Sequence, residues 1–216
     1  MKRYGSVGTR SLLFGVHQYL WHPVTVWLAW KELYGRPNWQ ETLCIVLHDL
    51  GYWGKKSMNG NDGVNHPEAG AELAGRLFGE EYRQLVLGHS RSYAQSHNTN
   101  PSRLCWADKL SIKYEPWWFY LTRARLSGEL KEYRAMADQK GFIGKNRSHR
   151  EWLSRLKRQM IEQAYEEANV AGRMSGPQCQ ELPTKPYHNA NRELRAQVID
   201  ENGKPGISCM LKLRLK

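Results

Sequence analysis

The chain has 216 residues, of which 40% are hydrophobic and 25% are charged. This composition is typical of a globular domain with a sizeable core and an appendage, and it excludes a disordered or fibrous chain. Lys and Arg number 32 against 21 Asp and Glu, giving a net charge of +11, which favours anionic partners. Residues 111–216 contribute +8 of that charge, from 20 basic and 12 acidic residues.

The N-terminal segment and the cysteines indicate the compartment. Residues 11–30 include His17, Gln18, His22 and Pro23 and show no clean apolar core or cleavage site. We therefore expect neither a signal peptide nor a membrane span. The four cysteines are widely spaced, without a C-x-x-C motif. This usage predicts reduced thiols and a cytoplasmic protein.

Helical patterns follow one another along most of the chain. His22 and Pro23 open one helix, because proline is tolerated in a first turn, and Asn38 is a suitable N-cap for the next. Residues 54–65 and 90–100 are polar and predict loops. The predicted helices cover residues 11–21, 22–33, 38–50, 66–78 and 80–89, then a segment from residue 100, a segment ending near 140, and 149–172.

Composition changes at residue 175, where prolines become frequent and apolar residues rare. We expect two parts: a helical domain over 1–174 and a basic linker and tail over 175–216. Residues 197–200 and 207–215 flank a Gly- and Pro-containing turn, a pattern that predicts a small β-hairpin. The predicted fold class is therefore all-α, a helical bundle with a C-terminal extension.

A run of five apolar residues, 43–47, leads directly into the adjacent pair His48 and Asp49. Apolar runs are buried, and an ionisable pair carried into an interior must be paired or bound to a metal. The dipeptide alone is equally consistent with a His–Asp hydrogen bond in a helical core and with a metal site. Five further candidates fall on or near other predicted helices: His22, His66, His89, His97 and Asp108.

The order H…HD…H…H…D resembles the HD superfamily of metal-dependent phosphohydrolases. The matching residues are His22, His48-Asp49 with the following Leu50-Gly51, and the segment 107–110, and the resemblance covers about residues 12–125. It implies an HD-type helical bundle in which His22, His48, Asp49 and Asp108 bind a metal ion. The subset with two metals would add His66 and His89 on a second ion, with Asp49 bridging.

The resemblance implies hydrolysis of a phosphoester, as a monoesterase or a diesterase, by a metal-activated water. One or two divalent ions would serve, and the ligand types do not distinguish Mn, Fe, Co, Mg, Ni or Zn. Asp49, His97, Arg91 and Lys109 are the catalytic candidates, with His97 as a proton donor. Lys55, Lys56 and Arg91 are the candidates for substrate binding. The basic, Trp- and Tyr-rich chain favours a nucleotide as substrate.

The sequence departs from the family pattern at Tyr52, where many relatives have a lysine three residues after the doublet; Lys55 or Lys56 could substitute. The segment Gly51-Tyr52 is not the signature of the cyclic-dinucleotide phosphodiesterase branch, so that substrate is not assigned.

Two other functions are compatible with the same residues. The H…HD…H…H…D order also occurs in di-iron oxygenases resembling myo-inositol oxygenase and in carbon–phosphorus-cleaving enzymes, which bind iron and consume oxygen. Alternatively, the domain is a non-catalytic binding or regulatory module whose basic C-terminal half engages nucleic acid. A hairpin at residues 197–215 could also dimerise, because a lone hairpin is marginally stable.

Overall fold

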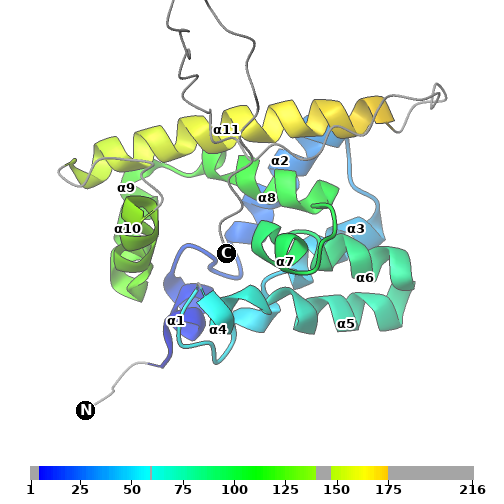
Figure 1. Cartoon of the computed structure of the whole chain (residues 1–216), viewed down its shortest axis with the longest axis horizontal. Helices are drawn as coiled ribbons and strands as arrows, with labels where there is room; N and C mark the ends of the chain where they lie inside the picture. Colours follow the sequence, from blue (N-terminus) through cyan, green and yellow to red (C-terminus); the bar gives the residue numbers. More distant parts are fainter. Residues whose placement is uncertain (1–4, 59, 140–146, 175–216) are drawn as a thin grey trace, which may run out of the picture. The chain divides into compact units, whose positions relative to one another are not determined.

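A computed structural model describes residues 5–58, 60–139 and 147–174. Every regular element within these ranges is a helix, which confirms the all-α prediction (Figure 1). The elements in chain order are α1 (Val7–Phe14), α2 (His22–Tyr34), α3 (Trp39–Leu47), η1 (Leu50–Tyr52), α4 (Gly60–Val64), α5 (Pro67–Phe78), α6 (Glu80–Leu87), α7 (Arg91–Ser96), α8 (Arg103–Ser111), η2 (Ile112–Tyr114), α9 (Trp117–Ser127), α10 (Glu129–Gln139) and α11 (His149–Met174).

Two predicted helix starts are confirmed, and a capping box also opens α11. Helix α2 begins at His22 with Pro23 in its first turn. Asn38 caps α3 through a complete capping box with Glu41. Ser148 and Glu151 exchange the same pair of side-chain to backbone hydrogen bonds before α11. These caps satisfy backbone N–H groups that have no partner within the helix.

Other boundaries differ from the predictions. The first helix covers Val7–Phe14 instead of 11–21, because Ser6 caps it and the Gly15 N–H bonds back to Arg10 and Ser11. Helix α3 ends at Leu47, since Asp49 leaves the helical conformation. The N-cap of α5 is His66.

The predicted polar loops contain short helices. Ser90 caps α7 inside the expected loop 90–100, where Tyr93 and Ala94 are buried. Helix α4 lies within the expected loop 54–65. Burial and a good cap therefore override polar composition at these positions.

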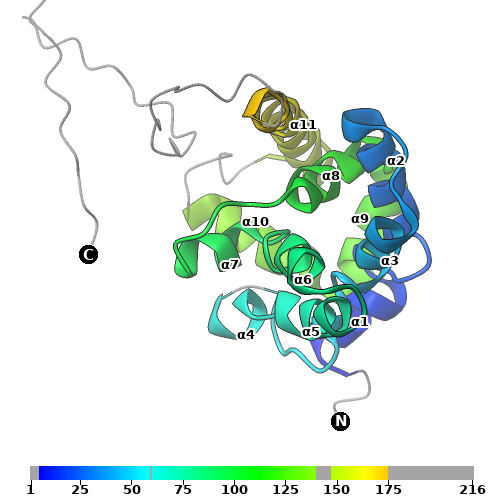
Figure 2. The same ribbon diagram turned by 90° about the vertical axis from the view of Figure 1, so that its right-hand side faces the viewer.

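The larger hydrophobic cluster joins the helices that carry the predicted ligands His22, His48 and Asp108. Helices α5 and α6 lie side by side as an antiparallel pair, and α8 packs between α2 and α11 (Figures 1 and 2). Trp30 of α2, Ile45 of α3 and Leu104 of α8 are almost fully buried within it. The predicted buried thiol Cys44 belongs to this cluster and is buried and free.

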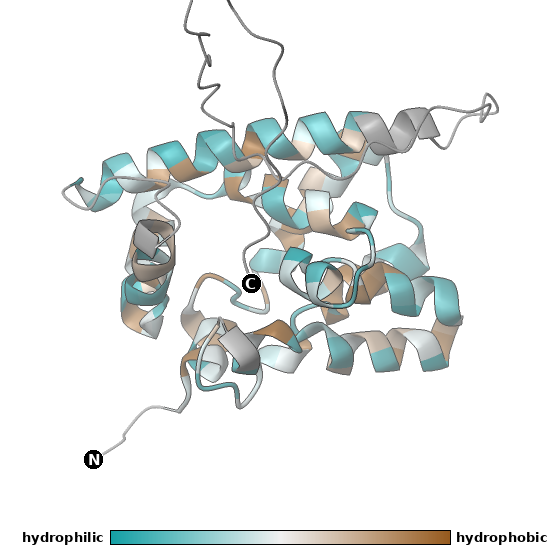
Figure 3. Ribbon diagram, in the orientation of Figure 1, coloured by the Kyte–Doolittle hydropathy of each residue, from teal (hydrophilic) through white to brown (hydrophobic). Residues whose placement is uncertain are grey.

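A second cluster joins α9, α10 and α11 around Val16, Ile112 and Trp152. Figure 3 shows hydrophilic and hydrophobic residues alternating along α11, as expected of an amphipathic helix. The apolar residues of α11 at four-residue spacing fall into two groups. Trp152, Ala164 and Ala168 are buried, whereas Leu156 and Met160 are half-buried and border a cavity.

The chain divides into two units, Met1–Pro177 and Gln178–Lys216, and the described residues belong to the first. The predicted hairpin and most of the basic tail over 175–216 lie outside the described residues. The boundary at residue 175, the tail's binding of nucleic acid and its dimerisation therefore stay predictions. No helix among the described residues is long and apolar enough to cross a membrane.

Candidate metal centre

Five of the six predicted ligands lie at helix ends, Asp108 lies within α8, and all six side chains meet in one cluster. His22 is the first residue of α2, and His48 and Asp49 follow the last residue of α3. His66 precedes α5, and His89 follows the end of α6. Asp108 projects from α8. Helix ends from across the chain thus supply imidazole and carboxylate groups to a single site, as bundles with core metal sites do.

The two carboxylate oxygens of Asp49 point at different histidines. Its Oδ2 lies 3.1 Å from Nε2 of His48 and 3.3 Å from Nε2 of His22. Its Oδ1 lies 3.5 Å from Nε2 of His89 and 3.7 Å from Nε2 of His66. Asp49 therefore stands between two pairs of imidazole nitrogens, with one oxygen for each pair.

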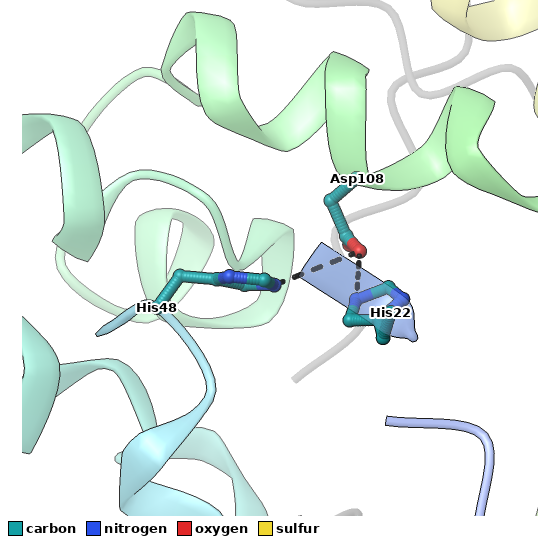
Figure 4. A group of neighbouring side chains, drawn as sticks. All are labelled: His22, His48 and Asp108. Atoms are coloured by element: carbon teal, nitrogen blue, oxygen red, sulfur yellow. Dashed lines mark ion pairs between the residues drawn. The ribbon is translucent and has the colours of Figure 1, made fainter. Parts of the chain in front are cut away.

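Asp108 completes the first of these two groups. Its Oδ1 lies 3.1 Å from Nε2 of His22 and 4.0 Å from Nε2 of His48, and Figure 4 shows the three side chains converging. Two overlapping sets thus have ligand atoms close enough to hold an ion: His22, His48 and Asp108, and His48, Asp49 and His89. The cluster could therefore hold a metal ion.

Three of the histidines are oriented by the same kind of local hydrogen bond to the backbone. Nδ1 of His48, His66 and His89 lies 2.6–2.7 Å from the backbone carbonyl three residues earlier in each case. A carbonyl can only accept, so Nδ1 donates its hydrogen and the neutral ring presents the Nε2 lone pair to the cluster. Metal-binding histidines are commonly held in this way by an outer hydrogen bond.

The inner atoms of the cluster fit a bound metal cation. Among the described residues, Nε2 of His22, Nε2 of His48 and Oδ2 of Asp49 are buried without a hydrogen-bond partner. Nε2 of His66 lies 2.9 Å from Nε2 of His89. Because both rings donate through Nδ1, two nitrogen lone pairs face each other when the rings are neutral. A shared divalent ion would remove this repulsion and satisfy the orphaned atoms.

The electrostatics divide the histidines into two kinds. Burial lowers the pKa of His66 to about 3, aided by the neighbouring His89, whose pKa burial also lowers. Burial opposes charge on His22 too, but contacts with Asp108 and Asp49 outweigh it and raise the pKa of His22 to about 10. Burial disfavours the Asp49 carboxylate, yet the surrounding histidines hold its pKa well below its usual range. Without metal, His66 and His89 are thus neutral and ready to ligate.

Glycines allow the helix ends to approach this closely. A Cβ on Gly51 would lie 1.9 Å from the carbonyl oxygen of His66. A Cβ on Gly70 would lie 2.2 Å from the carbonyl oxygen of Leu47, at the end of α3. Backbone contacts of this kind exclude any side chain. The two glycines therefore fix the distance between the His48-Asp49 corner and the start of α5.

A cavity of about 330 Å³ adjoins the cluster on the side of His22 and Asp108. Helices α10 and α11 supply much of its wall. The cavity is lined by Val16, His17, His22, Tyr52, Met58, Arg91, Asp108, Lys109, Ser111, Ile112, Glu115, Tyr120, Tyr133, Met136, Ala137, Trp152, Leu156, Gln159, Met160 and Gln163. His48, Asp49, His66 and His89 are not among the described residues that line it, so the cavity meets the cluster at His22 and Asp108.

The structure brings some of the predicted substrate residues to this cavity and leaves others outside. Arg91 and Lys109 are in the wall, and Nη1 of Arg91 donates to Oε1 of Gln163 at 2.5 Å. Lys55, Lys56 and His97 are not among the described residues that line it. His97 is exposed and stacks on Tyr93, with ring centroids 4.0 Å apart.

Sequence reasoning missed a contact between His17, which lines the cavity, and the fully buried Glu129. Nδ1 of His17 lies 3.0 Å from Oε1 of Glu129. The same Oε1 accepts hydrogen bonds from Ser11 Oγ and Tyr133 Oη, and Oε2 accepts one from the Val16 N–H. Burial disfavours charge on both groups, but their mutual contact lowers the pKa of Glu129, while the charges of Asp49 and Glu129 raise that of His17. The residues are 112 positions apart, so no spacing signal could have revealed the pair.

Tyr52 also reaches the site, as a packing partner. Its ring stacks on His66, with centroids 3.9 Å apart and planes 8° from parallel. Tyr52 therefore supports the ring of His66 by stacking. Neither Lys55 nor Lys56 is among the described residues that line the cavity beside Tyr52.

Comparisons of the chain with protein-family models, curated proteins and solved structures find no match.

Proposed function

We propose that this chain is a metal-dependent phosphohydrolase of the HD type. Its metal centre would be the cluster around Asp49, formed by His22, His48, Asp49, His66, His89 and Asp108. The observation that carries the proposal is the position of Asp49, whose two oxygens face two separate groups of imidazole nitrogens. His22, His48, Asp49 and Asp108 would hold one divalent ion. Asp49, His66 and His89 would hold a second. A pair of divalent ions lowers the pKa of a bound water and neutralises charge on a phosphoryl group.

The surrounding residues fit the binding of a phosphoester. Arg91 and Lys109 are the basic side chains in the wall of the cavity, and we assign them to the phosphate oxygens. The largely apolar remainder of the wall limits water, which strengthens charge interactions within the site. Hydrolysis breaks the ester P–O bond, joins the oxygen of water to phosphorus and releases an alcohol that takes up a proton.

The proposal is tested by phosphate release from a panel of nucleotides and simple phosphoesters, with Mn²⁺, Co²⁺ or Mg²⁺ added. Asp49→Asn is the matched blank, because it keeps the shape of the side chain while removing its charge. We expect release by the wild type and at most one-hundredth of that rate in the variant. If no metal supports release, the hydrolase proposal is wrong, and iron content with oxygen uptake becomes the next measurement.

A further inference from the structure

Beyond Arg91 and Lys109, the wall of the cavity combines apolar side chains with polar ones such as Tyr133, Gln159 and Gln163. Helices α10 and α11 contribute Met136, Ala137, Leu156 and Met160, and Met58 lies in the wall as well. Methionine side chains adapt their shape to apolar groups of different outlines. A volume of about 330 Å³ is at the small end of ligand pockets. The wall is therefore suited to a compact apolar group.

Two buried polar atoms belong to residues of this wall. Nε1 of Trp152 and Oε1 of Glu115 have no hydrogen-bond partner among the described residues. The two residues are only 1% and 3% exposed, and both line the cavity. An unpaired buried donor or acceptor is costly, and because both residues line the cavity, a group bound there can supply the missing partners. Trp152 requires an acceptor and Glu115 requires a donor.

The second carboxylate oxygen of Glu115 is already engaged. Oε2 pairs with Nη2 of Arg123 at 2.5 Å, and Nη1 of Arg123 also donates to the Gly15 carbonyl. Arg123 therefore balances the charge of Glu115, and the free Oε1 calls for a neutral donor. A hydroxyl group both donates and accepts, so it suits both orphaned atoms.

We propose that the substrate is the phosphate ester of a mainly apolar alcohol that carries at least one further hydroxyl group. The inference rests on the proposed phosphohydrolase function and narrows its substrate class. The phosphate lies against Arg91 and Lys109, the apolar body lies between α10 and α11, and the hydroxyl meets Trp152 or Glu115. Nucleoside phosphates are the alternative that the test compares, because Tyr133, Gln159 and Gln163 of the same two helices also line the cavity.

The experiment compares kcat/KM for phosphate release within matched series of substrates. The first series is alkyl phosphates from methyl to hexyl, the second is the same esters with a terminal hydroxyl, and the third is nucleoside 5′-monophosphates. Each added methylene should raise kcat/KM by about fourfold until the cavity is full. The best hydroxylated ester should exceed its plain counterpart by about five- to tenfold.

Two alanines of α10 supply a matched pair of variants. Ala137→Leu fills part of the cavity, whereas Ala135→Leu makes the same change at an exposed position of the same helix. We expect Ala137→Leu to lower kcat/KM for hexyl phosphate at least tenfold and for methyl phosphate less than twofold. Ala135→Leu should leave both unchanged. Trp152→Phe should remove the preference for the hydroxylated ester while keeping the chain-length trend.

Failure of this inference is distinguishable from failure of the proposed function. If nucleotides are hydrolysed best and alkyl esters show no chain-length trend, the substrate class is wrong while the hydrolase assignment stands. If no ester is hydrolysed, calorimetry on the manganese-treated protein measures binding of hexylphosphonate and 6-hydroxyhexylphosphonate. Tighter binding of the hydroxylated compound that Ala137→Leu weakens would support the inference. Absence of binding, or equal binding to Ala137→Leu, would overturn it.

Discussion

The close approach of α5 to the end of α3 is tested by Gly70→Ala. The new Cβ would lie 2.2 Å from the carbonyl oxygen of Leu47 and 2.9 Å from its carbonyl carbon. Ordinary contact begins at 3.4 Å, so the two backbones would have to separate by 3.4 − 2.2, or about 1.2 Å. His66 immediately precedes α5 and would move away from Asp49.

The magnitude follows from two opposing effects. Forcing extra volume into a packed interior costs about 1–3 kcal/mol. Replacing glycine by alanine within a helix returns up to about 1 kcal/mol. The net loss in the free energy of unfolding should be about 1–2 kcal/mol, and the melting temperature of a domain of this size should fall by about 2–8 °C.

Gly75→Ala is the matched control on the same helix. There the new Cβ meets only the side chain of Arg83, at 3.0 Å or more. Urea and thermal unfolding of both metal-free variants would measure the difference, and calorimetry with Mn²⁺ would report the affinity of the cluster. We expect Gly75→Ala to be near neutral and Gly70→Ala to lose stability and manganese affinity. Equal stability of the two variants would refute the reasoning about α5.

Three further predictions concern the site. In metal-free protein the pKa of His66 is lowered to about 3 and that of His89 is also lowered, so the unfolded chain binds protons first as pH falls below 6.5. The free energy of unfolding should therefore drop from pH 6.5 to pH 4. Urea unfolding across this range measures the drop, and a flat profile would contradict the prediction. The raised pKa of His22, about 10, has the opposite sign, so stability should also fall above pH 7 and His22→Gln should flatten that limb. Arg91→Ala and Lys109→Ala should each lower kcat/KM for phosphate release at least tenfold, whereas Lys55→Ala and Lys56→Ala should change it less than twofold. Equal effects of all four variants would show that the cavity is not the substrate-binding site.

A fourth prediction concerns the support of the wall. Glu129 is fully buried and accepts hydrogen bonds from Ser11, Val16, Tyr133 and Ser127. Glu129→Ala should lower the free energy of unfolding by about 3–5 kcal/mol, because it leaves several buried donors unpaired. Urea denaturation measures this loss. A variant within 1 kcal/mol of the wild type would show that the network contributes little.

Several residues of the buried cluster lie beside local signals in the sequence. The apolar run before His48, the proline after His22 and the proline after His66 all indicate where helices begin or end. The all-α class followed from the same periodicity. Helix boundaries were less accurate where a single cap decided them, as at Ser6 and Ser90.

The cavity could not be predicted, because its wall joins residues that are distant in the chain. Glu129 meets His17 across 112 positions, and Arg91 meets Gln163 across 72. Such contacts depend on how α10 and α11 pack, which no periodicity specifies. For the same reason, composition could not separate Arg91 and Lys109, which reach the cavity, from Lys55 and Lys56, which do not.

The most direct test of the central claim is the metal content of the protein after loading with Mn²⁺ and removal of free ion, measured by plasma mass spectrometry. A cluster organised around the two oxygens of Asp49 predicts two manganese ions per chain in the wild type and none retained in Asp49→Asn. If the wild type retains no metal, or if Asp49→Asn retains as much as the wild type, the six residues are not a metal centre.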